Sequence, residues 1–422
     1  MEAYATALTY AIPGFTLLII LEAIAAYFMN QPINRAMDTI SSLSSGMTNT
    51  IKSLLGLSII ILSYEWMVDH FALFEINSPL WLYILAFFGI DFASYWSHRF
   101  NHSINLFWNR HVVHHSSEEF NLSCALRQEI SAFIGVYFFL YIPLAIIGVP
   151  AKVIAIVSPL HLFAQFWYHT RLINKMGWLE YIIVTPSHHR VHHAINEEYI
   201  DKNFGTILIV WDRFFGTFQK ELADVPPVYG TLKQANTWNP VIINFLHFWQ
   251  LVKDAWHAQN WWDKLRIWFM PTGWRPVDVQ NRFPIETVTD VYSRPKYAPE
   301  TSNFLRNWSW FQLSITNALV YYALASFASF DYVYIVLYLI CMFITIFAYT
   351  SLMDKHPIAM PAELLKLTFG LGLIYLMNGW YGLDDYLYGA SVLVTLYFLV
   401  SAGLTAYFLF FEKRFVLKTV SK

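Results

Sequence analysis

Residues 98–115 read HRFNHSINLFWNRHVVHH, and this stretch decides how the rest of the chain is interpreted. It contains two histidine patterns, H-x-x-x-H at its beginning and H-x-x-H-H at its end, and a second H-x-x-H-H closes at His193. The histidines of the three patterns are His98, His102, His111, His114, His115, His189, His192 and His193. Residues three or four positions apart on a helix share a face, so each pattern can direct its imidazoles to one place.

The chemistry of these patterns is that of a metal site. Imidazole nitrogen suits zinc, copper, iron and nickel, and a metal ion allows neutral imidazoles to lie close together. The histidines are too many for one ion, so the sequence predicts two metal ions. The Glu-x-x-His pattern of soluble di-iron bundles does not occur in this sequence, and we therefore expect a site built from histidines.

The composition around the patterns is that of a membrane protein. Of the 422 residues, 56% are hydrophobic and 13% are charged, whereas a soluble domain carries about 25% charged residues. The 27 Lys and Arg nearly balance the 29 Asp and Glu, so no net field favours nucleic acid or another polyanion. Two cysteines are too few for a disulfide framework or a cysteine-based zinc site.

Apolar stretches of about 20 residues predict an all-α fold, a polytopic membrane helical bundle with about nine spans. The expected spans are 9–28, 51–68, 79–97, 129–148, 153–171, 309–329, 333–352, 361–378 and 387–411. Lys and Arg fall almost entirely on one side of this layout, which predicts an outer N-terminus and a cytosolic C-terminus in a bacterial inner membrane or the endoplasmic reticulum. The basic residues of the tail are Lys413, Arg414, Lys418 and Lys422. Two spans separate the second and third patterns, so all three patterns are expected on the cytosolic face.

The same layout predicts four parts of the chain. They are N-terminal transmembrane helices (1–78), a histidine-box domain (79–220), a cytosolic or interfacial amphipathic segment (221–308) and C-terminal transmembrane helices (309–422). Within the third part, tryptophans alternate with charged residues between 244 and 270. This pattern is typical of helices that lie on a membrane surface, and it fits equally well an amphipathic helix packed against the spans.

The three patterns, in this order and between apolar spans, resemble the fatty acid hydroxylase/sterol desaturase superfamily of membrane oxygenases with a non-heme di-iron centre. The resemblance extends to the alkylglycerol monooxygenase subgroup over about residues 60–275. It is carried by 111-HVVHHSSEEFNLSCALRQ-128, 185-TPSHHRVHH-193, 201-DKNFG-205 and 211-WDRFFGTF-218. The resemblance implies that the eight histidines of the patterns bind two iron ions and that His169 completes the site.

The implied activity is hydroxylation of a lipid C–H bond with O2. If the carbon lies next to an ether oxygen, the product collapses to an aldehyde and glycerol. Electrons would come from a reductase or ferredoxin-like partner, because the sequence has neither a GxGxxG run nor the cysteines of an iron–sulfur cluster. Two alternatives remain open: a fatty-acyl or sterol hydroxylase or desaturase on the same centre, and a non-enzymatic histidine-rich protein that handles metal.

Two carboxylates are the further catalytic candidates. Asp91 lies seven residues before His98 on the same helical face, and we expect it to accept a hydrogen bond from a ligand imidazole. Glu118 follows the second pattern, three residues after His115. Two positions differ from the alkylglycerol monooxygenases, which have Glu where Ser103 stands and Tyr where Phe120 stands. Because that Glu is tied to tetrahydrobiopterin use in the subgroup, Ser103 predicts weak or absent dependence on this pterin.

Overall fold

Helices make up the regular secondary structure of the computed structural model, which describes residues 2–412. In that range the only β-type pairings are four isolated bridges, so the predicted all-α fold is confirmed. The basic residues of the tail, from Lys413 onward, lie outside the described residues. Their cytosolic position stays a prediction.

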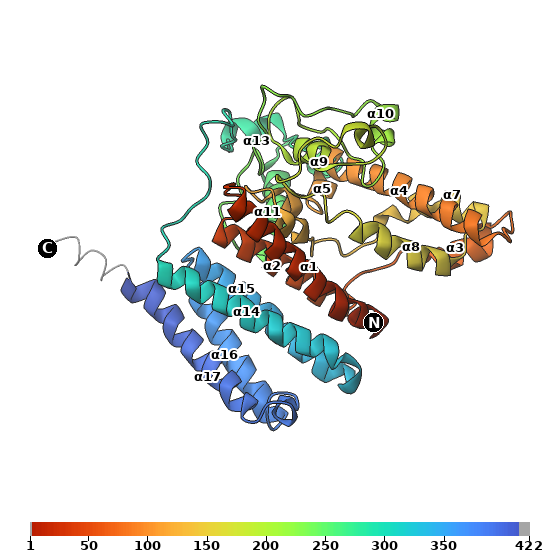
Figure 1. Cartoon of the computed structure of the whole chain (residues 1–422). Helices are drawn as coiled ribbons and strands as arrows, with labels where there is room; N and C mark the ends of the chain where they lie inside the picture. Colours follow the sequence, from red (N-terminus) through yellow and green to blue (C-terminus); the bar gives the residue numbers. More distant parts are fainter. Residues whose placement is uncertain (1, 413–422) are drawn as a thin grey trace.

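The helices fall into three groups, which Figure 1 shows along the chain. The N-terminal pair is α1 (Glu2–Phe28) and α2 (Ala36–Leu54). The histidine region contains α3 (Tyr64–Phe71), α4 (Pro79–Ser103), α5 (Asn105–Trp108), α6 (Val112–His115), α7 (Ile142–Ile147), α8 (Ala151–Phe163), α9 (Pro186–His193) and α10 (Val210–Phe215), followed by α11 (Pro240–His257), α12 (Trp261–Arg266) and α13 (Val277–Arg282). The C-terminal bundle consists of α14 (Asn303–Ala325), α15 (Tyr332–Met353), α16 (Ala359–Leu376) and α17 (Ala390–Ala406).

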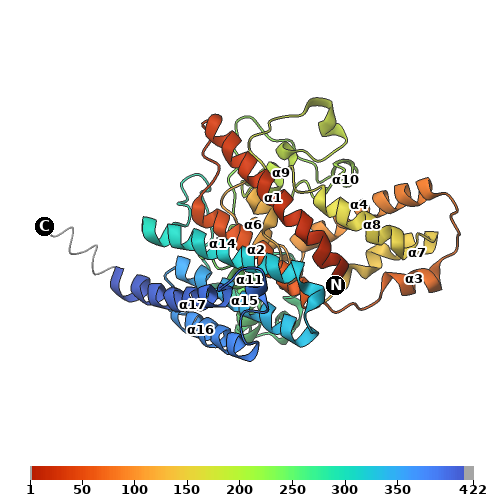
Figure 2. The same ribbon diagram turned by 60° about the horizontal axis from the view of Figure 1, so that its bottom comes forward.

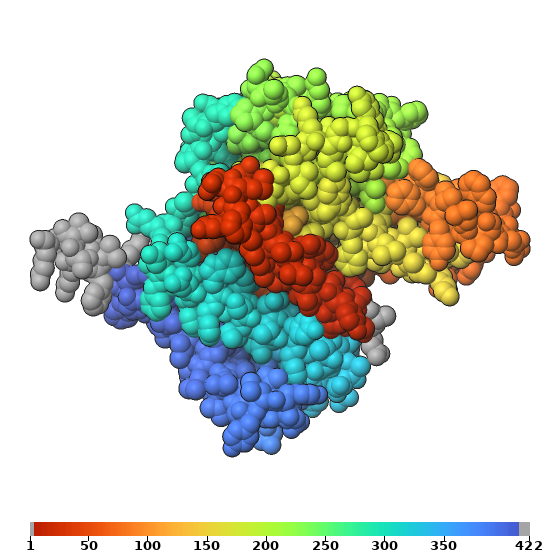
Figure 3. Space-filling view, in the orientation of Figure 1, coloured from red at the N-terminus to blue at the C-terminus, as the bar shows by residue number. Residues whose placement is uncertain are grey.

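The C-terminal bundle and α2 share one apolar core. In sequence order each helix of the bundle packs on the next, and α2 packs against both α14 and α15. Ile40 and Ile51 of α2 join Val320, Leu339 and Phe398 in this core. The N-terminal helix α1 lies along α14, which Figure 3 shows from the outside. The N-terminal pair and the C-terminal bundle are therefore packed together.

A second lobe extends away from the bundle and contains α3, α4, α7 and α8 (Figures 1 and 2). Both α7 and α8 pack against α4, and α7 also packs against α3. Gly148 ends α7 with a φ of +85°, and a side chain at this position would collide with the carbonyl oxygen of Phe74. Pro150 then precedes α8 as its N-cap residue. Helix α8 brings the chain back along α4, at whose end the histidines lie.

Among the described residues, five helices are long and apolar enough to cross a membrane, judged by length and composition. They are Tyr4–Phe28, Pro79–Ser103, Tyr332–Met353, Ala359–Leu376 and Ala390–Phe411. These correspond to the first, third, seventh, eighth and ninth expected spans. The sixth expected span lies on α14, which is as long but carries more polar residues.

The other expected spans differ from the structure, and the count of nine is not confirmed. The stretch 51–68 is not one helix, since α2 ends at Leu54 and α3 begins only at Tyr64. The stretches 129–148 and 153–171 contain short apolar helices, Val136–Ile147 and Ala151–Phe163. Average hydropathy registers their apolar content, whereas residues 129–135 precede the first of these helices and residues 164–171 follow the second.

Candidate metal centre

The three histidine patterns lie on three helices that meet at one place. His98 and His102 occupy the last turns of α4. In the second pattern His111 is the N-cap residue of α6, and His114 and His115 end that helix. The third pattern ends α9. Thr185 caps α9 and Pro186 takes its first position, where a missing N–H costs nothing. His169 lies in the segment that follows the end of α8 at Phe163.

The structure brings all nine predicted histidines together and divides them into two groups. Within each group the possible ligand nitrogens lie within 4.8 Å of one another. The five-histidine group contains His98, His102, His111, His115 and His192. The four-histidine group contains His114, His169, His189 and His193. His188, which precedes the third pattern, belongs to neither group.

Each H-x-x-H-H pattern contributes to both groups. His111 and His115 join the five-histidine group, while His114 between them joins the other. The third pattern does the reverse, because His189 and His193 belong to the four-histidine group and His192 to the five-histidine group. On a helix, positions i+3 and i+4 are offset by about 60° and about 40° in opposite directions. The expected single stripe therefore serves two neighbouring groups.

The ring nitrogens within each group converge closely. The separations between Nε2 atoms are 2.9 Å for His98 and His111, 3.2 Å for His102 and His115, 3.3 Å for His114 and His169, 2.8 Å for His169 and His189, and 3.0 Å for His189 and His193. Two nitrogens bound at right angles to one ion at about 2.1 Å lie about 3.0 Å apart. His192 Nε2 is also buried without a partner in the described part of the chain. The donor set fits one transition-metal ion in each group.

Backbone carbonyls hold the opposite nitrogen of several rings. His98 Nδ1 donates to the oxygen of Phe204 at 2.9 Å and His192 Nδ1 to that of Lys202 at 3.0 Å. His169 Nδ1 donates in the same way to Gln165, at 3.0 Å. A carbonyl only accepts, so the proton is on Nδ1 and the lone pair of Nε2 points inward. This arrangement is typical of metal-binding histidines.

Burial keeps these imidazoles neutral. The pKa of His114 is lowered to about 3, first by loss of solvent and then by neighbouring imidazoles such as His98. The pKa of His115, His189 and His193 is lowered well below the ordinary range for the same two reasons. At neutral pH their lone pairs are therefore free to bind a cation.

Asp91 is fully buried, but its partners are not the nine histidines. Its carboxylate accepts hydrogen bonds from His161 Nε2 at 2.8 Å and Trp211 Nε1 at 2.8 Å. It also accepts from the backbone N–H groups of Ile207 and Leu208. The expected bond from a ligand imidazole is not among the hydrogen bonds of residues 2–412. Sequence reasoning missed His161, whose place one helix away from Asp91 no spacing rule reveals.

A second buried carboxylate, Asp212, links the two runs 201–205 and 211–218, which carry part of the family resemblance. Asp212 accepts the backbone N–H groups of Phe204 and Gly205, both at 2.7 Å. A side chain at Gly205 would come within 2.7 Å of this carboxylate, so only glycine fits. Together Asp91 and Asp212 fix the loop between α9 and α10. That loop presents the carbonyls of Lys202 and Phe204 to the five-histidine group.

Glu118 lies in an ion-pair network that is separate from the nine histidines. Its carboxylate bonds Arg294 at 3.0 Å and the backbone N–H of Tyr297 at 2.7 Å. The neighbouring Glu119 pairs with Arg171 at 3.1 Å and with Lys296. Among the described residues no hydrogen bond joins Glu118 to any of the nine imidazoles. Its catalytic role stays a prediction, and its observed contacts tie the segment after α6 to residues 294–297.

The two positions that differ from the alkylglycerol monooxygenases have different surroundings. Phe120 is fully buried, with its ring centroid 5.8 Å from that of His169 and 5.2 Å from that of His193. It stacks on Tyr229 at 5.1 Å. Ser103 is exposed and donates to the carbonyl of Arg99 in its own helix. Phe120 therefore borders the four-histidine group directly, and Ser103 faces away from the interior.

The chain is similar to known proteins, and the similarity includes the histidine region. The family model described as fatty acid hydroxylase matches residues 83–217, the range that contains all nine histidines. An alkylglycerol monooxygenase from Homo sapiens is 34% identical over 363 residues, covering 84% of this chain and 80% of that protein. This chain belongs to the fatty acid hydroxylase family, together with the alkylglycerol monooxygenases.

Other members of the family match smaller parts of the chain. An alkylglycerol monooxygenase from Danio rerio is 40% identical over 268 residues, 63% of this chain and 59% of that protein. An ornithine lipid hydroxylase from Rhizobium tropici is 29% identical over 138 residues, 32% of this chain and 41% of that protein. No solved structure is significantly similar. As a fatty acid hydroxylase family member with membrane helices, the chain is an oxidoreductase, a membrane lipid monooxygenase, and the alternative of a passive metal-handling protein is excluded.

Proposed function

We propose that this enzyme uses O2 and two iron ions to hydroxylate an alkylglycerol-type lipid at the carbon next to the ether oxygen. One observation carries the proposal: nine buried imidazoles form two groups in a chain that is 34% identical to an alkylglycerol monooxygenase over most of its length. Iron is favoured among the metals that suit imidazole because of the family. The five-histidine group would hold one ion and the four-histidine group the other.

The chain's own residues would orient the metals and keep water out. Bound iron would supply the activation of O2 and the attack on the C–H bond. The carbonyls of Lys202 and Phe204 fix the rings of His192 and His98, and the loop that carries them is held by Asp212. The rings of Phe120 and Tyr168 would form apolar walls of the site, since each packs on a histidine of the four-histidine group. We propose Asp91 and Asp212 as positioning residues.

The reaction would add one oxygen atom of O2 to the lipid and release the other as water, with two electrons and two protons from an external donor. The hydroxylated carbon next to an ether oxygen is a hemiacetal, which collapses to a fatty aldehyde and a glycerol. We place the site on the cytosolic face because the Lys and Arg of the sequence gather on that side. A reductase or ferredoxin-like protein would deliver the electrons there.

A direct assay would test the substrate. The purified, iron-loaded enzyme would be given an alkylglycerol or the matching ester-linked lipid, under isotope-labelled O2. We expect an aldehyde from the ether lipid only, and no product from His189→Ala, while His70→Ala, which alters an exposed histidine of α3, should retain full activity. A double bond in the product, or a stable hydroxyl on an acyl chain with no aldehyde, would contradict ether cleavage.

Acyl hydroxylation is the second candidate function. It is favoured by the similarity of 138 residues of this chain to the ornithine lipid hydroxylase. The assay above separates the two, because an acyl hydroxyl is stable whereas the hemiacetal is not.

The reductant can be tested at Ser103. We propose weak or absent dependence on tetrahydrobiopterin, because serine removes a carboxylate beside His102 and with it a charge-assisted bond of roughly 1.5–3 kcal/mol. Ser103→Glu is then expected to tighten pterin binding by about one to two orders of magnitude. Pterin-supported turnover should increase as a result. Ser103→Gln, which adds length without charge, is the matched control. Full wild-type activity that requires tetrahydrobiopterin at low concentration would refute the proposal.

A further inference from the structure

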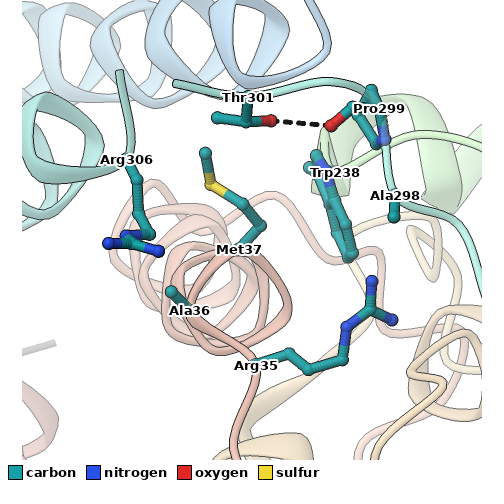
Figure 4. A pocket seen from close by; sticks show the side chains of 8 residues that line it. All are labelled: Arg35, Ala36, Met37, Trp238, Ala298, Pro299, Thr301 and Arg306. Atoms are coloured by element: carbon teal, nitrogen blue, oxygen red, sulfur yellow. Dashed lines mark hydrogen bonds between the residues drawn. The ribbon is translucent and has the colours of Figure 1, made fainter. Parts of the chain in front are cut away.

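A small pocket lies far along the chain from the histidines, where the start of α2 meets the segment that leads into α14. Its volume is about 250 Å³. Figure 4 shows Arg35, Met37, Trp238 and Arg306 around the same space, with Thr301 closing one side. None of these side chains has a part in the reaction proposed above.

Positively charged groups from two helices border the pocket. Arg35 and Ala36 stand at the start of α2, and Arg306 lies in the first turns of α14. No side-chain oxygen caps α2. The first N–H groups of a helix have no acceptor within it, and they carry a partial positive charge. This is the usual setting for an anion at a helix N-terminus.

The buried indole of Trp238 points independently to a missing acceptor. Only 4% of this residue is exposed, and its Nε1 has no hydrogen-bond partner among residues 2–412. A buried donor without an acceptor is costly and uncommon in folded proteins. Since Trp238 lines the pocket, an occupant with acceptor oxygens would complete its hydrogen bonding.

The neighbouring acids do not neutralise these donors. Arg35 lies 3.6 Å from Glu118 and 3.8 Å from Glu119, but both carboxylates have nearer cations in Arg294 and Arg171, at 3.0 and 3.1 Å.

Asp38 does not neutralise the two pocket arginines either. Asp38, in the first turn of α2, is paired with Arg127 at 3.0 Å. Arg306 is exposed and makes no ion pair within the described part of the chain. A further carboxylate, Asp354, accepts the backbone N–H of Trp238 at 2.9 Å but does not line the pocket. The residues that line the pocket include two arginines and no acid.

We propose that this pocket is a binding site for a phosphate group, either that of a membrane lipid headgroup or a free phosphate. The shared chemistry is a compact anion with several acceptor oxygens, matched to two guanidinium groups, one indole N–H and a helix N-terminus. Arg35 also faces Glu118 and Glu119, which follow the second histidine pattern. A bound anion would thus alter the ion pairs of the segment that follows α6.

Binding can be measured on the full-length protein in detergent, without any activity assay. Titration with inorganic phosphate by calorimetry should show saturable binding. Trp238→Phe removes the N–H but keeps an aromatic ring, and Arg306→Gln removes one charge. Each is expected to weaken phosphate binding about tenfold or more, the effect of one lost charge-assisted hydrogen bond. The matched control is Arg282→Gln, which removes an exposed arginine of α13 far from this pocket's lining.

Native mass spectrometry of the same samples distinguishes the source of the phosphate. A phospholipid that co-purifies with the wild type, is lost in both pocket variants and is displaced by inorganic phosphate would support a headgroup site. Phosphate binding without a retained phospholipid would support a site for the free anion. No saturable binding of either, or equal affinity in wild type, both pocket variants and the control, would overturn the proposal.

Discussion

The interior of the histidine region and the interior of the C-terminal bundle are made of different side chains. Between α4, α6 and α9 the buried groups include His189, Asp91 and other polar residues. Between α14 and α17 they are mainly apolar, with Val320, Leu339 and Phe398 at the centre. Removal from water is enough to stabilise apolar groups, whereas buried polar groups need partners. The first interior therefore depends on what its imidazoles bind, and the second does not.

The bundle also contains buried polar residues, and one charged pair stands out among them. Lys366 of α16 is fully buried and pairs with Glu363 at 2.6 Å. Its ammonium group also donates to Ser401 of α17 at 2.6 Å, and Gln312 of α14 donates to the same hydroxyl. This network joins three helices of the bundle. It is a polar centre held by an ion pair and by hydrogen bonds among its own side chains, whereas the histidine groups are proposed to hold metal ions.

The largest effect is expected from breaking that buried pair. Lys366→Met would leave the Glu363 carboxylate buried without its cation and is expected to lower the free energy of unfolding by about 3–5 kcal/mol. Adding Glu363→Leu should restore most of the loss, because apolar residues of similar volume replace such pairs at little cost. Thermal unfolding in detergent measures both variants. A single variant within about 0.5 kcal/mol of wild type would show that the pair does not stabilise the bundle.

Metal removal is expected to act on the other region. Metal held at a hundredfold excess over its dissociation constant stabilises the bound state by about 2.7 kcal/mol, which corresponds to about hundredfold slower amide exchange. Chelation should therefore accelerate exchange in α6 and α9 by about that factor and leave α15 unchanged. Mass spectrometry after deuterium exchange measures both regions in one sample. Equal acceleration in α9 and α15 would contradict the contrast between them.

The smallest of these effects concerns the loop that supports one histidine group. Asp212→Asn keeps the shape of the side chain but replaces one acceptor oxygen for the N–H groups of Phe204 and Gly205. We expect the metal affinity of the five-histidine group to fall by about 10–100-fold, because the carbonyl that holds His98 is then less well fixed. The four-histidine group should be unaffected. Asp290→Asn, at an exposed carboxylate, is the control. Equal loss from both groups would indicate general unfolding.

The convergence of the histidines could be predicted from the sequence because that information is local, whereas their role as metal ligands stays a prediction. Spacings of three and four residues place imidazoles on one side of a helix, and the structure brings together all nine that were named. Which metal group each joins could not be predicted, because His114 and His115 differ only in their angle around α6. The partner of Asp91 was also hidden, since His161 reaches it from a different helix.

The membrane layout shows the limit of averaged hydropathy. The stretches 129–148 and 153–171 are apolar, yet helix begins only at Val136 in the first and α8 ends at Phe163 in the second. A window of about 20 residues registers the apolar content and does not show where a helix begins or ends. The division of the chain into four parts, with boundaries after residues 78, 220 and 308, stays a prediction.

The metal content of the purified protein tests the central claim most directly. After anaerobic loading with iron and removal of excess metal, elemental analysis of the wild type should give two iron ions per chain, one for each histidine group. His189→Ala in the four-histidine group and His115→Ala in the five-histidine group should each retain about one. Two ions in the wild type and one in each variant would support the account. A wild-type content of zero or one, or loss of both ions in both variants while the bundle stays folded, would contradict it.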